Sequence, residues 1–326
     1  MIIVIWTLFM LTSFALILSG VVRQKLALMG RLQERDKLHY IAEAGIKKAI
    51  SEMKGREPKS FDTLADYWAD NAPLFANIQV GDGSASVSYG YYDDISGTRI
   101  TRYGLIDEER KININKADDV TLQRLFSIIL DMDEPDAAGL ACAVIDWRDS
   151  DNTSQSISGG AEDNYYLGLP GPYEAKDADF EVPEEIMLVK GIDKAAYDRL
   201  KDYITIYGGG KVNINTASRA ALMAAGLSLE LADKVAIFRC GEDQEPGTSD
   251  DNAFEAVSGI APLLSQYFHL SPSQLAEIST VAAESLGVAS GHFTIISNAM
   301  IKNRKGSQTA TCVVNKDGEV LYWRED

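Results

Sequence analysis

The 326-residue sequence contains few of the residues that build disulfide-linked domains. Its three cysteines, Cys142, Cys240 and Cys312, are too few and too widely spaced for a disulfide framework. At most one disulfide bond can form, in an oxidising compartment, so at least one thiol stays unpaired. We expect each cysteine to act as a small buried apolar side chain.

Histidine is equally scarce, and the three histidines, His39, His269 and His292, fall in unrelated segments. The sequence has no Gly-X-Ser-X-Gly, no His-Glu-X-X-His and no phosphate-binding loop. The glycine run at 208–210 precedes a lysine without the spacing of a phosphate loop, and we interpret it as a turn. These absences argue against an enzyme.

Positive charge is also in short supply, because 31 lysine and arginine residues face 48 aspartate and glutamate residues, a net charge of −17. Binding of nucleic acid requires clustered basic side chains that neutralise phosphates. We therefore expect no nucleic-acid partner, whereas the acidic balance is compatible with cation binding.

Charge is absent altogether from residues 1–22, a run long enough to cross a bilayer core of about 30 Å as a helix. Residues 23–53 contain no proline, and their apolar side chains recur close to helical spacing. The sequence predicts one unbroken helix of about 80 Å, with residues 1–22 in lipid and the second half against a soluble domain. A cleaved signal peptide is the alternative, but it requires basic residues ahead of the apolar run, and none precedes Arg23.

The orientation of this helix is ambiguous from its flanks. Arg23, Lys25 and Arg31 follow the apolar run, and taken alone they predict that the large domain lies in the cytoplasm.

Strand patterns occur near both ends of the chain. Residues 85–92 and 99–107 predict an antiparallel hairpin, preceded by a short helix at 61–68. Residues 292–301, 308–314 and 320–323 predict a meander. We expect the meander to join the hairpin in one sheet under the long helix. The predicted fold is α+β: a discontinuous domain of residues 23–110 and 286–326, interrupted by a large all-α domain at 111–285.

An internal repeat organises the inserted domain. The sequence KININKA at 111–117 recurs one hundred residues later as KVNINTA at 211–217. Each copy then predicts two helices, at 119–130 and 135–148 in the first and at 219–225 and 229–239 in the second. The units extend over 111–192 and 211–260, and we expect the asparagines at the start of each unit to cap its first helix or the approach to it.

An acidic insertion follows the second helix of the first unit. Asp149 and Asp151 lie two residues apart, and Glu162 and Asp163 follow after a Gly-Gly pair. Calcium takes six to eight oxygen ligands from flexible loops of this kind, so these four residues are the candidate metal ligands. Their spacing does not fit an EF-hand, and a solvated acidic loop is the alternative.

Two further features of the sequence are related to this candidate site. A second acidic insertion at 242–251 contains Glu242, Asp243, Asp250 and Asp251 and could hold a weaker cation site. Tyr165, Tyr166 and Tyr173 beside the first insertion either pack it onto the helices, which we expect, or form a contact patch for a partner.

The whole chain resembles the type IV pilin superfamily, and within it the minor pseudopilin K family of the type II secretion system. The resemblance rests on the N-terminal helix and on seven short sequences: AEAGI at 42–46, KININ at 111–115, IDWRDSD at 145–151, GGAEDNYY at 159–166, PYEAK at 172–176, VKG at 189–191 and VNINTA at 212–217.

The resemblance implies a non-enzymatic subunit at the tip of a periplasmic pseudopilus, anchored once in the inner membrane and processed by prepilin peptidase. Such a subunit forms a complex with minor pseudopilins I and J, primes fibre assembly and supports export of folded proteins across the outer membrane. The family's helical domain binds calcium. Most pilin-like subunits have a glutamate near the N-terminus; the K-type subunit is the exception, and position 5 here is Ile5.

The repeat also resembles the helix-hairpin-helix module of membrane-anchored DNA receptors of competence systems, which is the rival interpretation. Such hairpins carry Gly-hydrophobic-Gly between their helices, so that backbone N–H groups approach phosphate. The first unit has Met-Asp-Glu at 132–134 and the second has Gly-Leu-Ser at 226–228. Neither fits, which together with the net charge disfavours DNA binding.

Overall fold

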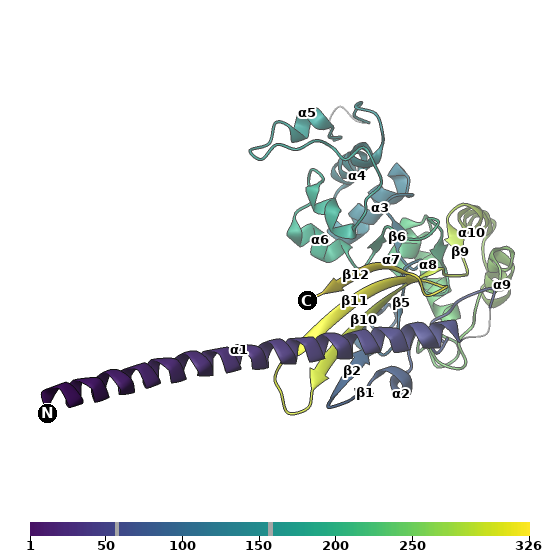
Figure 1. Cartoon of the computed structure of the whole chain (residues 1–326). Coiled ribbons are helices and arrows are strands. Elements are labelled where there is room, and N and C mark those ends of the chain that lie inside the picture. The colour runs from purple at the N-terminus through teal and green to yellow at the C-terminus, as the bar shows by residue number, and fades with distance from the viewer. Residues whose placement is uncertain (56–58, 156–158) are drawn as a thin grey trace.

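The computed structural model of the protein describes residues 1–55, 59–155 and 159–326. Its most extended element is α1 (Ile2–Lys54), a single helix of 53 residues that confirms the predicted unbroken helix. Within the described ranges it is the one helix long and apolar enough to cross a membrane. Figure 1 shows the N-terminal half of α1 projecting away from the rest of the molecule.

The C-terminal third of α1 belongs to the folded core. Its buried side chains begin at Leu38 and recur at helical spacing through Ile41, Ala42, Gly45, Ile46, Ala49 and Met53. The same helix leaves Leu28 and Leu32 exposed, although they continue this apolar pattern toward the N-terminus. A soluble fragment must therefore retain α1 from before Leu38, because this stripe fills one face of the core.

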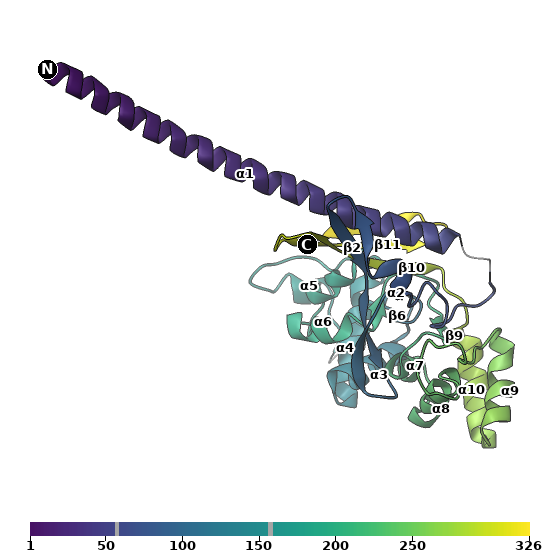
Figure 2. The same cartoon turned by 90° about the horizontal axis from the view of Figure 1, so that it is seen from below.

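One antiparallel sheet supports this part of α1. Its strands follow the order β1 (Ile78–Val80), β2 (Gly83–Val87), β10 (His292–Ile301), β11 (Ser307–Asn315) and β12 (Val320–Glu325). A further short strand, β5 (Ile106–Asp107), also pairs with β10. The predicted C-terminal meander is confirmed, and so is its pairing with the early strand region. Figures 1 and 2 show the sheet between α1 and the helical elements.

The predicted hairpin is confirmed but arranged differently. The first predicted strand divides at Ser88 into β2 and β3 (Tyr89–Asp93), and β3 pairs with β4 (Thr98–Arg102) in a separate two-stranded sheet. The chain leaves the main sheet at Ser88, whose N–H donates to the Ile296 carbonyl. The hairpin then turns toward the inserted domain, where the buried Arg102 donates to the Pro246 carbonyl.

The predicted helix at 61–68 is wrong, because the described part of this segment contains only turns and bends. A carboxylate oxygen of Asp66 accepts the N–H of Thr63 at 2.9 Å, and such a local bond competes with helix formation. Trp68 is buried in the core and lies edge-on to Phe293, with ring centroids 4.9 Å apart. A short helix, α2 (Ala72–Phe75), instead begins four residues after Trp68.

The predicted helix pairs of the inserted domain are confirmed within a residue at either end. The first pair is α3 (Asp119–Leu130) and α4 (Glu134–Arg148), and the second is α7 (Arg219–Ala224) and α8 (Leu229–Arg239). The remaining helices are α5 (Asp163–Tyr166), η1 (Pro183–Leu188), α6 (Lys194–Leu200), η2 (Val257–Gly259), α9 (Ile260–Tyr267) and α10 (Pro272–Glu284).

The inserted domain is not purely helical, because each unit is closed by a short parallel strand pair. In the first unit β6 (Ile112–Asn113) pairs with β7 (Ile204–Thr205), and in the second β8 (Val212–Asn213) pairs with β9 (Leu286–Gly287). The structural duplication thus extends beyond the regions of sequence identity, to Thr205 in the first unit and to Gly287 in the second.

The repeated asparagines fasten each unit internally. The side chain of Asn115 accepts the Phe180 N–H and donates to the Phe180 carbonyl, at 2.8 and 2.9 Å. Asn215 makes the same two bonds with Phe254, at the same distances. The asparagines do not cap the first helices themselves, because the caps are Asp118 and Ser218, which accept the N–H groups of Thr121 and Ala221. The expected cap on the approach to each helix is confirmed, since the side chains of Asn113 and Asn213 accept the N–H groups of Asn115 and Asn215 at 2.8 and 3.0 Å.

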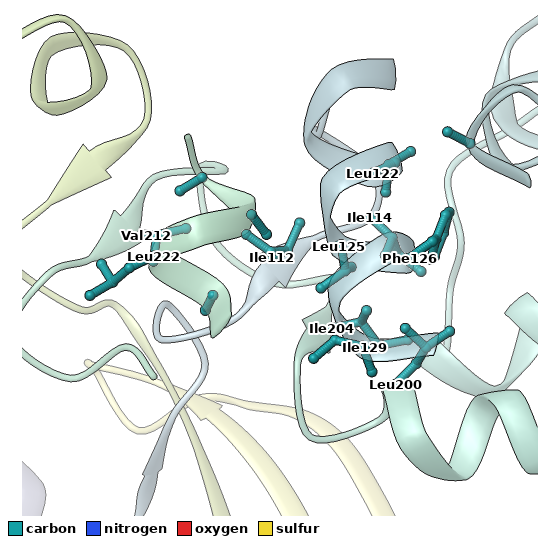
Figure 3. Packing of buried hydrophobic residues seen from close by; sticks show 14 of the residues in the cluster. Ile112, Ile114, Leu122, Leu125, Phe126, Ile129, Leu200, Ile204, Val212 and Leu222 are labelled. Carbon is teal, nitrogen blue, oxygen red and sulfur yellow. The ribbon is translucent and has the colours of Figure 1, made fainter. Parts of the chain in front are cut away.

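Buried apolar side chains form two clusters. One is made by α1, the main sheet and the 64–105 segment, and the other runs from Ile112 to Leu286 through the inserted domain. Figure 3 shows part of the second cluster, where Leu122, Leu125 and Phe126 of α3 pack beside the β6–β7 strand pair. The inserted domain therefore has its own core, which positions the acidic insertion away from α1.

Candidate metal centre

The first acidic insertion begins where α4 ends. Asp146, in the last turn of α4, is fully buried and accepts hydrogen bonds from described residues of the loop. Its partners are the Ser154 hydroxyl and the N–H groups of Gln155 and Ala161, all between 2.8 and 2.9 Å. Asp146 thus holds the described parts of the loop against the end of the helix on both sides of residues 156–158.

Three of the four predicted ligands come together. Asp149, Asp151 and Glu162 offer carboxylate oxygens that all lie within 4.8 Å of one another. Asp149 directly follows α4, and Glu162 directly precedes α5. Glu162 makes no capping bond to α5, so its side chain is available to the cluster. Among the described residues, this is the one such group of three or more potential ligand side chains.

Asp163 occupies a different place. One of its carboxylate oxygens accepts a bond from the Asn152 amide at 2.9 Å, and the other accepts the Ala175 N–H at 2.8 Å. These bonds connect the start of the loop to the segment after α5. Asp163 therefore supports the loop and is not gathered with the other three carboxylates.

The electrostatics of the cluster are unfavourable without a cation. Burial, reinforced by repulsion from Asp146, Asp149, Asp177 and Asp151, raises the pKa of Glu162 from 4.5 to about 7. Burial also raises the pKa of Asp149, although the Gln155 side chain partly opposes this. Both shifts report negative charge crowded into a poorly solvated site.

The donor set fits a hard divalent cation. Glu162 is 6% exposed, and neither of its carboxylate oxygens has a hydrogen-bond partner within the described structure. One oxygen of Asp149 is buried and unpartnered in the same way. Buried carboxylate oxygens without donors are costly, and calcium takes such oxygens as ligands. Asp149, Asp151 and Glu162 would hold the ion, with backbone carbonyls and water completing its coordination.

Sequence reasoning missed the role of Asp146, which anchors the insertion. The signal was present, because Asp146 lies three residues before Asp149 at the end of a predicted helix, where one turn brings the two side chains to the same side.

The second acidic insertion is organised around its own backbone. A carboxylate oxygen of Asp250 accepts the N–H groups of Glu242 and Asp243, at 2.8 and 3.1 Å. These bonds and one from Thr248 lower the pKa of Asp250 to about 2. Asp251 accepts the Gly247 N–H at 2.7 Å. The carboxylates here are occupied as turn acceptors.

The tyrosines beside the first insertion mainly pack the loop. Tyr166 is fully buried, edge-on to Trp147 and stacked on Tyr173 at centroid distances of 5.1 and 5.2 Å. Tyr165 is partly exposed, with the Lys190 ammonium 4.9 Å from its ring centroid. The expectation that these residues pack the insertion onto the helices is confirmed for Tyr166 and Tyr173.

The three cysteines and the three histidines differ in their structural environments. All three cysteines are free; Cys240 and Cys312 are buried, and Cys142 is half-buried. His292 pairs with Glu109, which lies between β5 and β6. Its Nδ1 is 2.8 Å from a carboxylate oxygen of Glu109, and this bond raises the pKa of the histidine. His39 pairs with Glu325 at 2.7 Å, and His269 is exposed.

A second functional surface is the free part of α1. Large apolar side chains stay exposed along residues 2–22 and continue beyond the uncharged run at Leu26, Leu28, Met29 and Leu32. A contiguous apolar surface of this extent marks a membrane or protein contact.

Comparison with known proteins finds relatives in sequence and in structure. A family model described as type II secretion system protein K matches residues 104–209. A protein of Pseudomonas aeruginosa called type II secretion system protein K is 25% identical over 316 residues, which cover 94% of this chain and 86% of the relative. An Aeromonas hydrophila protein of the same name is 37% identical over 100 residues, 29% of this chain and 30% of the relative.

The fold has a solved counterpart. One chain of the crystal structure of the GspK-GspI-GspJ complex from the enterotoxigenic Escherichia coli type 2 secretion system superposes with a TM-score of 0.64. The similarity covers 93% of this chain and 99% of that chain at 18% identity. The long helix on an antiparallel sheet, the large inserted helical domain and the matching relatives together support the recognition of this chain as a minor pseudopilin K of the type II secretion system.

Proposed function

We propose that this protein is the subunit at the tip of the type II secretion pseudopilus, where it binds minor pseudopilins I and J and initiates fibre assembly. Its contribution to secretion is structural and not enzymatic. The solved complex that contains a chain of this fold is a complex of GspK with GspI and GspJ, which supports the choice of partners.

The observation that carries the proposal is the exposed apolar surface of α1 outside the uncharged run. Leu28, Met29 and Leu32 are 57%, 57% and 50% exposed, whereas the apolar side chains of the stripe that begins at Leu38 are buried. Exposed apolar side chains at this spacing on a helix fit packing against other helices. The N-terminal helices of the partner pseudopilins would be these other helices.

The N-terminal end of α1 fits a terminal position in the fibre. The uncharged run of α1 contains no acidic residue, and Glu34 is the acidic residue that first follows it. In pilin-like fibres a glutamate near the N-terminus neutralises the terminal amine of the subunit above. A tip subunit has no neighbour above it, and a carboxylate in lipid is costly.

We further propose that α1 anchors the protein once in the inner membrane, that the head lies in the periplasm and that prepilin peptidase processes the precursor. The basic flank at Arg23, Lys25 and Arg31 favours the opposite orientation when taken alone. A C-terminal alkaline phosphatase fusion tests the orientation, because the enzyme folds only outside the cytoplasm. We expect an active fusion; an inactive but full-length fusion would place the head in the cytoplasm.

The partner proposal is tested by co-purification of the full chain with minor pseudopilins I and J from detergent. We expect Leu28→Glu combined with Leu32→Glu to lower recovery of the complex at least tenfold. The matched control is Leu229→Glu with Ile237→Glu, two similarly exposed apolar residues on α8 of the head. Equal recovery for both double variants, or for the wild type no recovery at all, would contradict the proposal.

The DNA-receptor alternative receives no support from the hairpin regions. The connection between α3 and α4 carries Asp131 and Asp133, which would repel phosphate. A gel shift at low salt separates the two functions, and we expect no complex with DNA.

We also propose calcium as the ligand of the candidate metal centre, on the strength of the unpartnered oxygens of Glu162 and Asp149. Calorimetry on the full chain in detergent should show a saturable calcium heat that is absent in Glu162→Gln. A solvated acidic loop would give no heat and no chelator-sensitive change in melting temperature.

A further inference from the structure

Basic residues are concentrated at the end of the head that faces the membrane helix. Two segments, 23–37 and 302–305, contain eight of the 31 lysine and arginine residues and only two acidic residues, a net charge of +6. The other 23 basic and 46 acidic residues leave −23 on the rest of the chain. We call the eight the basic collar: Arg23, Lys25, Arg31, Arg35, Lys37, Lys302, Arg304 and Lys305.

The two segments lie side by side although they are far apart in the sequence. The turn between β10 and β11 contains residues 302–305 and lies next to α1, at the end of the sheet nearest the projecting part of the helix (Figure 1). Arg31 and Arg304 line one groove of about 330 Å³. Lys37, at the edge of the same groove, pairs with Asp82 at 2.7 Å.

Most of the collar is free to bind a ligand. All eight side chains belong to exposed residues. Across residues 1–55, 59–155 and 159–326, Lys37 is the collar residue with an ion-pair partner, and Arg23 bonds to the Ser19 hydroxyl. A strongly acidic protein that leaves its other basic side chains unpaired at one end presents a surface complementary to anions.

If residues 1–22 span the bilayer, Arg23 and Lys25 lie at the height of the lipid headgroups, and the rest of the collar lies beyond them. Arg23 and Lys25 directly follow the uncharged run, and Arg31 lies about 14 Å further along the helix axis. Helical side chains lean toward the N-terminus, which here points to the membrane, so long basic side chains reach back toward it. The headgroup layer extends about 5–7 Å beyond the hydrocarbon core, and its potential a further Debye length of about 8 Å.

We propose that the basic collar binds anionic phospholipid headgroups of the membrane in which α1 is anchored. The contact draws the β10–β11 turn onto the bilayer, while the remaining surface, at −23, is repelled from it. The collar thus sets how closely the head rests on the membrane before the subunit enters a fibre. This inference rests on the membrane anchoring in the proposed function, but not on which side of the membrane the head occupies.

The test is lysine footprinting of the full chain in nanodiscs, with an amine-reactive aqueous reagent read by mass spectrometry. Nanodiscs of pure phosphatidylcholine are compared with nanodiscs containing 30% phosphatidylglycerol. Each basic residue that reaches an anionic surface contributes about fivefold in binding. We expect labelling of Lys302 and Lys305 to fall about fivefold with phosphatidylglycerol and to recover in 0.5 M salt. Lys316, in the β11–β12 turn, is the internal control and should label equally in both.

Two variants separate the collar from general charge. Arg31→Gln with Arg304→Gln removes two collar charges but keeps the lysine reporters, and it should abolish most of the protection. Lys194→Gln with Lys201→Gln removes the same charge from the first residue of α6 and from the residue that follows this helix, both exposed, and should leave the protection intact.

Equal labelling of Lys302 in both lipids, or equal loss of protection in both variants, would overturn the proposal. Protection that appears only when an acidic protein partner is added, and in both lipids, would assign the collar to that partner instead. Co-sedimentation with phosphatidylcholine vesicles reports anchoring by α1 separately. If anchoring fails, the proposed function fails; if anchoring holds without lipid-dependent protection, only the collar proposal fails.

Discussion

The replacement Glu162→Gln tests the candidate metal centre most sharply, because it changes charge while keeping the shape of the side chain. Glu162 is buried beside Asp149 and Asp151, and its pKa is raised from 4.5 to about 7 by burial and by the neighbouring carboxylates. Glutamine removes the charge and can donate its amide to an adjacent carboxylate. We therefore expect opposite effects of the change with and without calcium.

The sign and size in the absence of calcium follow from linkage. A carboxyl whose folded pKa lies above its unfolded value binds more protons in the folded state, so stability falls as pH rises between the two values. The window here runs from 4.5 to about 7. A shift of this size corresponds to a loss of about 3 kcal/mol, complete above pH 7. Glu162→Gln should regain an amount of this order at pH 8 and almost nothing at pH 4.

The assay is urea denaturation of the full chain in detergent with a calcium chelator, at several values between pH 4 and pH 8. Tryptophan fluorescence reports unfolding, because Trp68 and Trp147 are buried. Glu255→Gln is the matched control, the same chemical change at an exposed position. The difference between the two variants isolates the buried carboxyl from other titrating groups.

Calcium should reverse the ranking. At one hundred times its dissociation constant, a ligand of the folded state stabilises by about 2.7 kcal/mol, and Glu162→Gln should lose this gain. A Glu162→Gln variant whose stability relative to Glu255→Gln does not change between pH 4 and pH 8 would refute the electrostatic reasoning. Equal calcium stabilisation of the wild type and Glu162→Gln would refute the ligand assignment.

Three further substitutions test the fold, each by urea denaturation. A Cβ at Gly45 would lie 2.2 Å from the Ser297 hydroxyl, whereas a Cβ at Gly30 meets nothing within 4 Å. Gly45→Ala should therefore destabilise by about 1–3 kcal/mol and Gly30→Ala should not; equal effects would contradict the close packing of α1. Asn215→Ala should cost about 2–5 kcal/mol, because two backbone groups of Phe254 lose their partner; a loss below 1 kcal/mol would exclude this role. Glu109 raises the pKa of His292, so its stabilisation is complete below pH 6.5 and declines as pH rises through the raised value. Glu109→Gln should thus cost about 1.5–3 kcal/mol at pH 6 and less at pH 9, and a larger cost at pH 9 would contradict the pairing.

The elements that depend on local pattern could be predicted from the sequence. The absence of charge in residues 1–22 and the apolar spacing after Arg23 sufficed to predict α1 as one helix. The near-identity of 111–117 and 211–217 revealed the duplication, and the helices of both units begin and end within a residue of their predicted bounds.

The elements that depend on distant contacts could not be predicted. Asn115 is a plausible helix cap by sequence alone, and its true partner, Phe180, lies sixty-five residues away. The segment 61–68 has helical composition, but the burial of Trp68 and the Asp66 turn outweigh local propensity. The buried part of α1 begins at Leu38, and this position depends on where the sheet ends.

The candidate site falls between these cases. The composition of the acidic loop can be seen in the sequence, and it sufficed to predict the three carboxylates that come together. The fourth, Asp163, binds an amide and a backbone N–H whose positions depend on the folded loop. The burial of Glu162, which distinguishes a built site from a solvated loop, is a tertiary property.

We propose above all that one copy of this protein lies at the tip of each pseudopilus. The most direct measurement is electron microscopy of isolated pseudopili with a gold label on the C-terminus, which lies at the end of β12 in the head (Figure 1). We expect a single label at one end of a fibre and none along its length. Labels distributed along the fibres, or fibres of normal number and length without the protein, would contradict it.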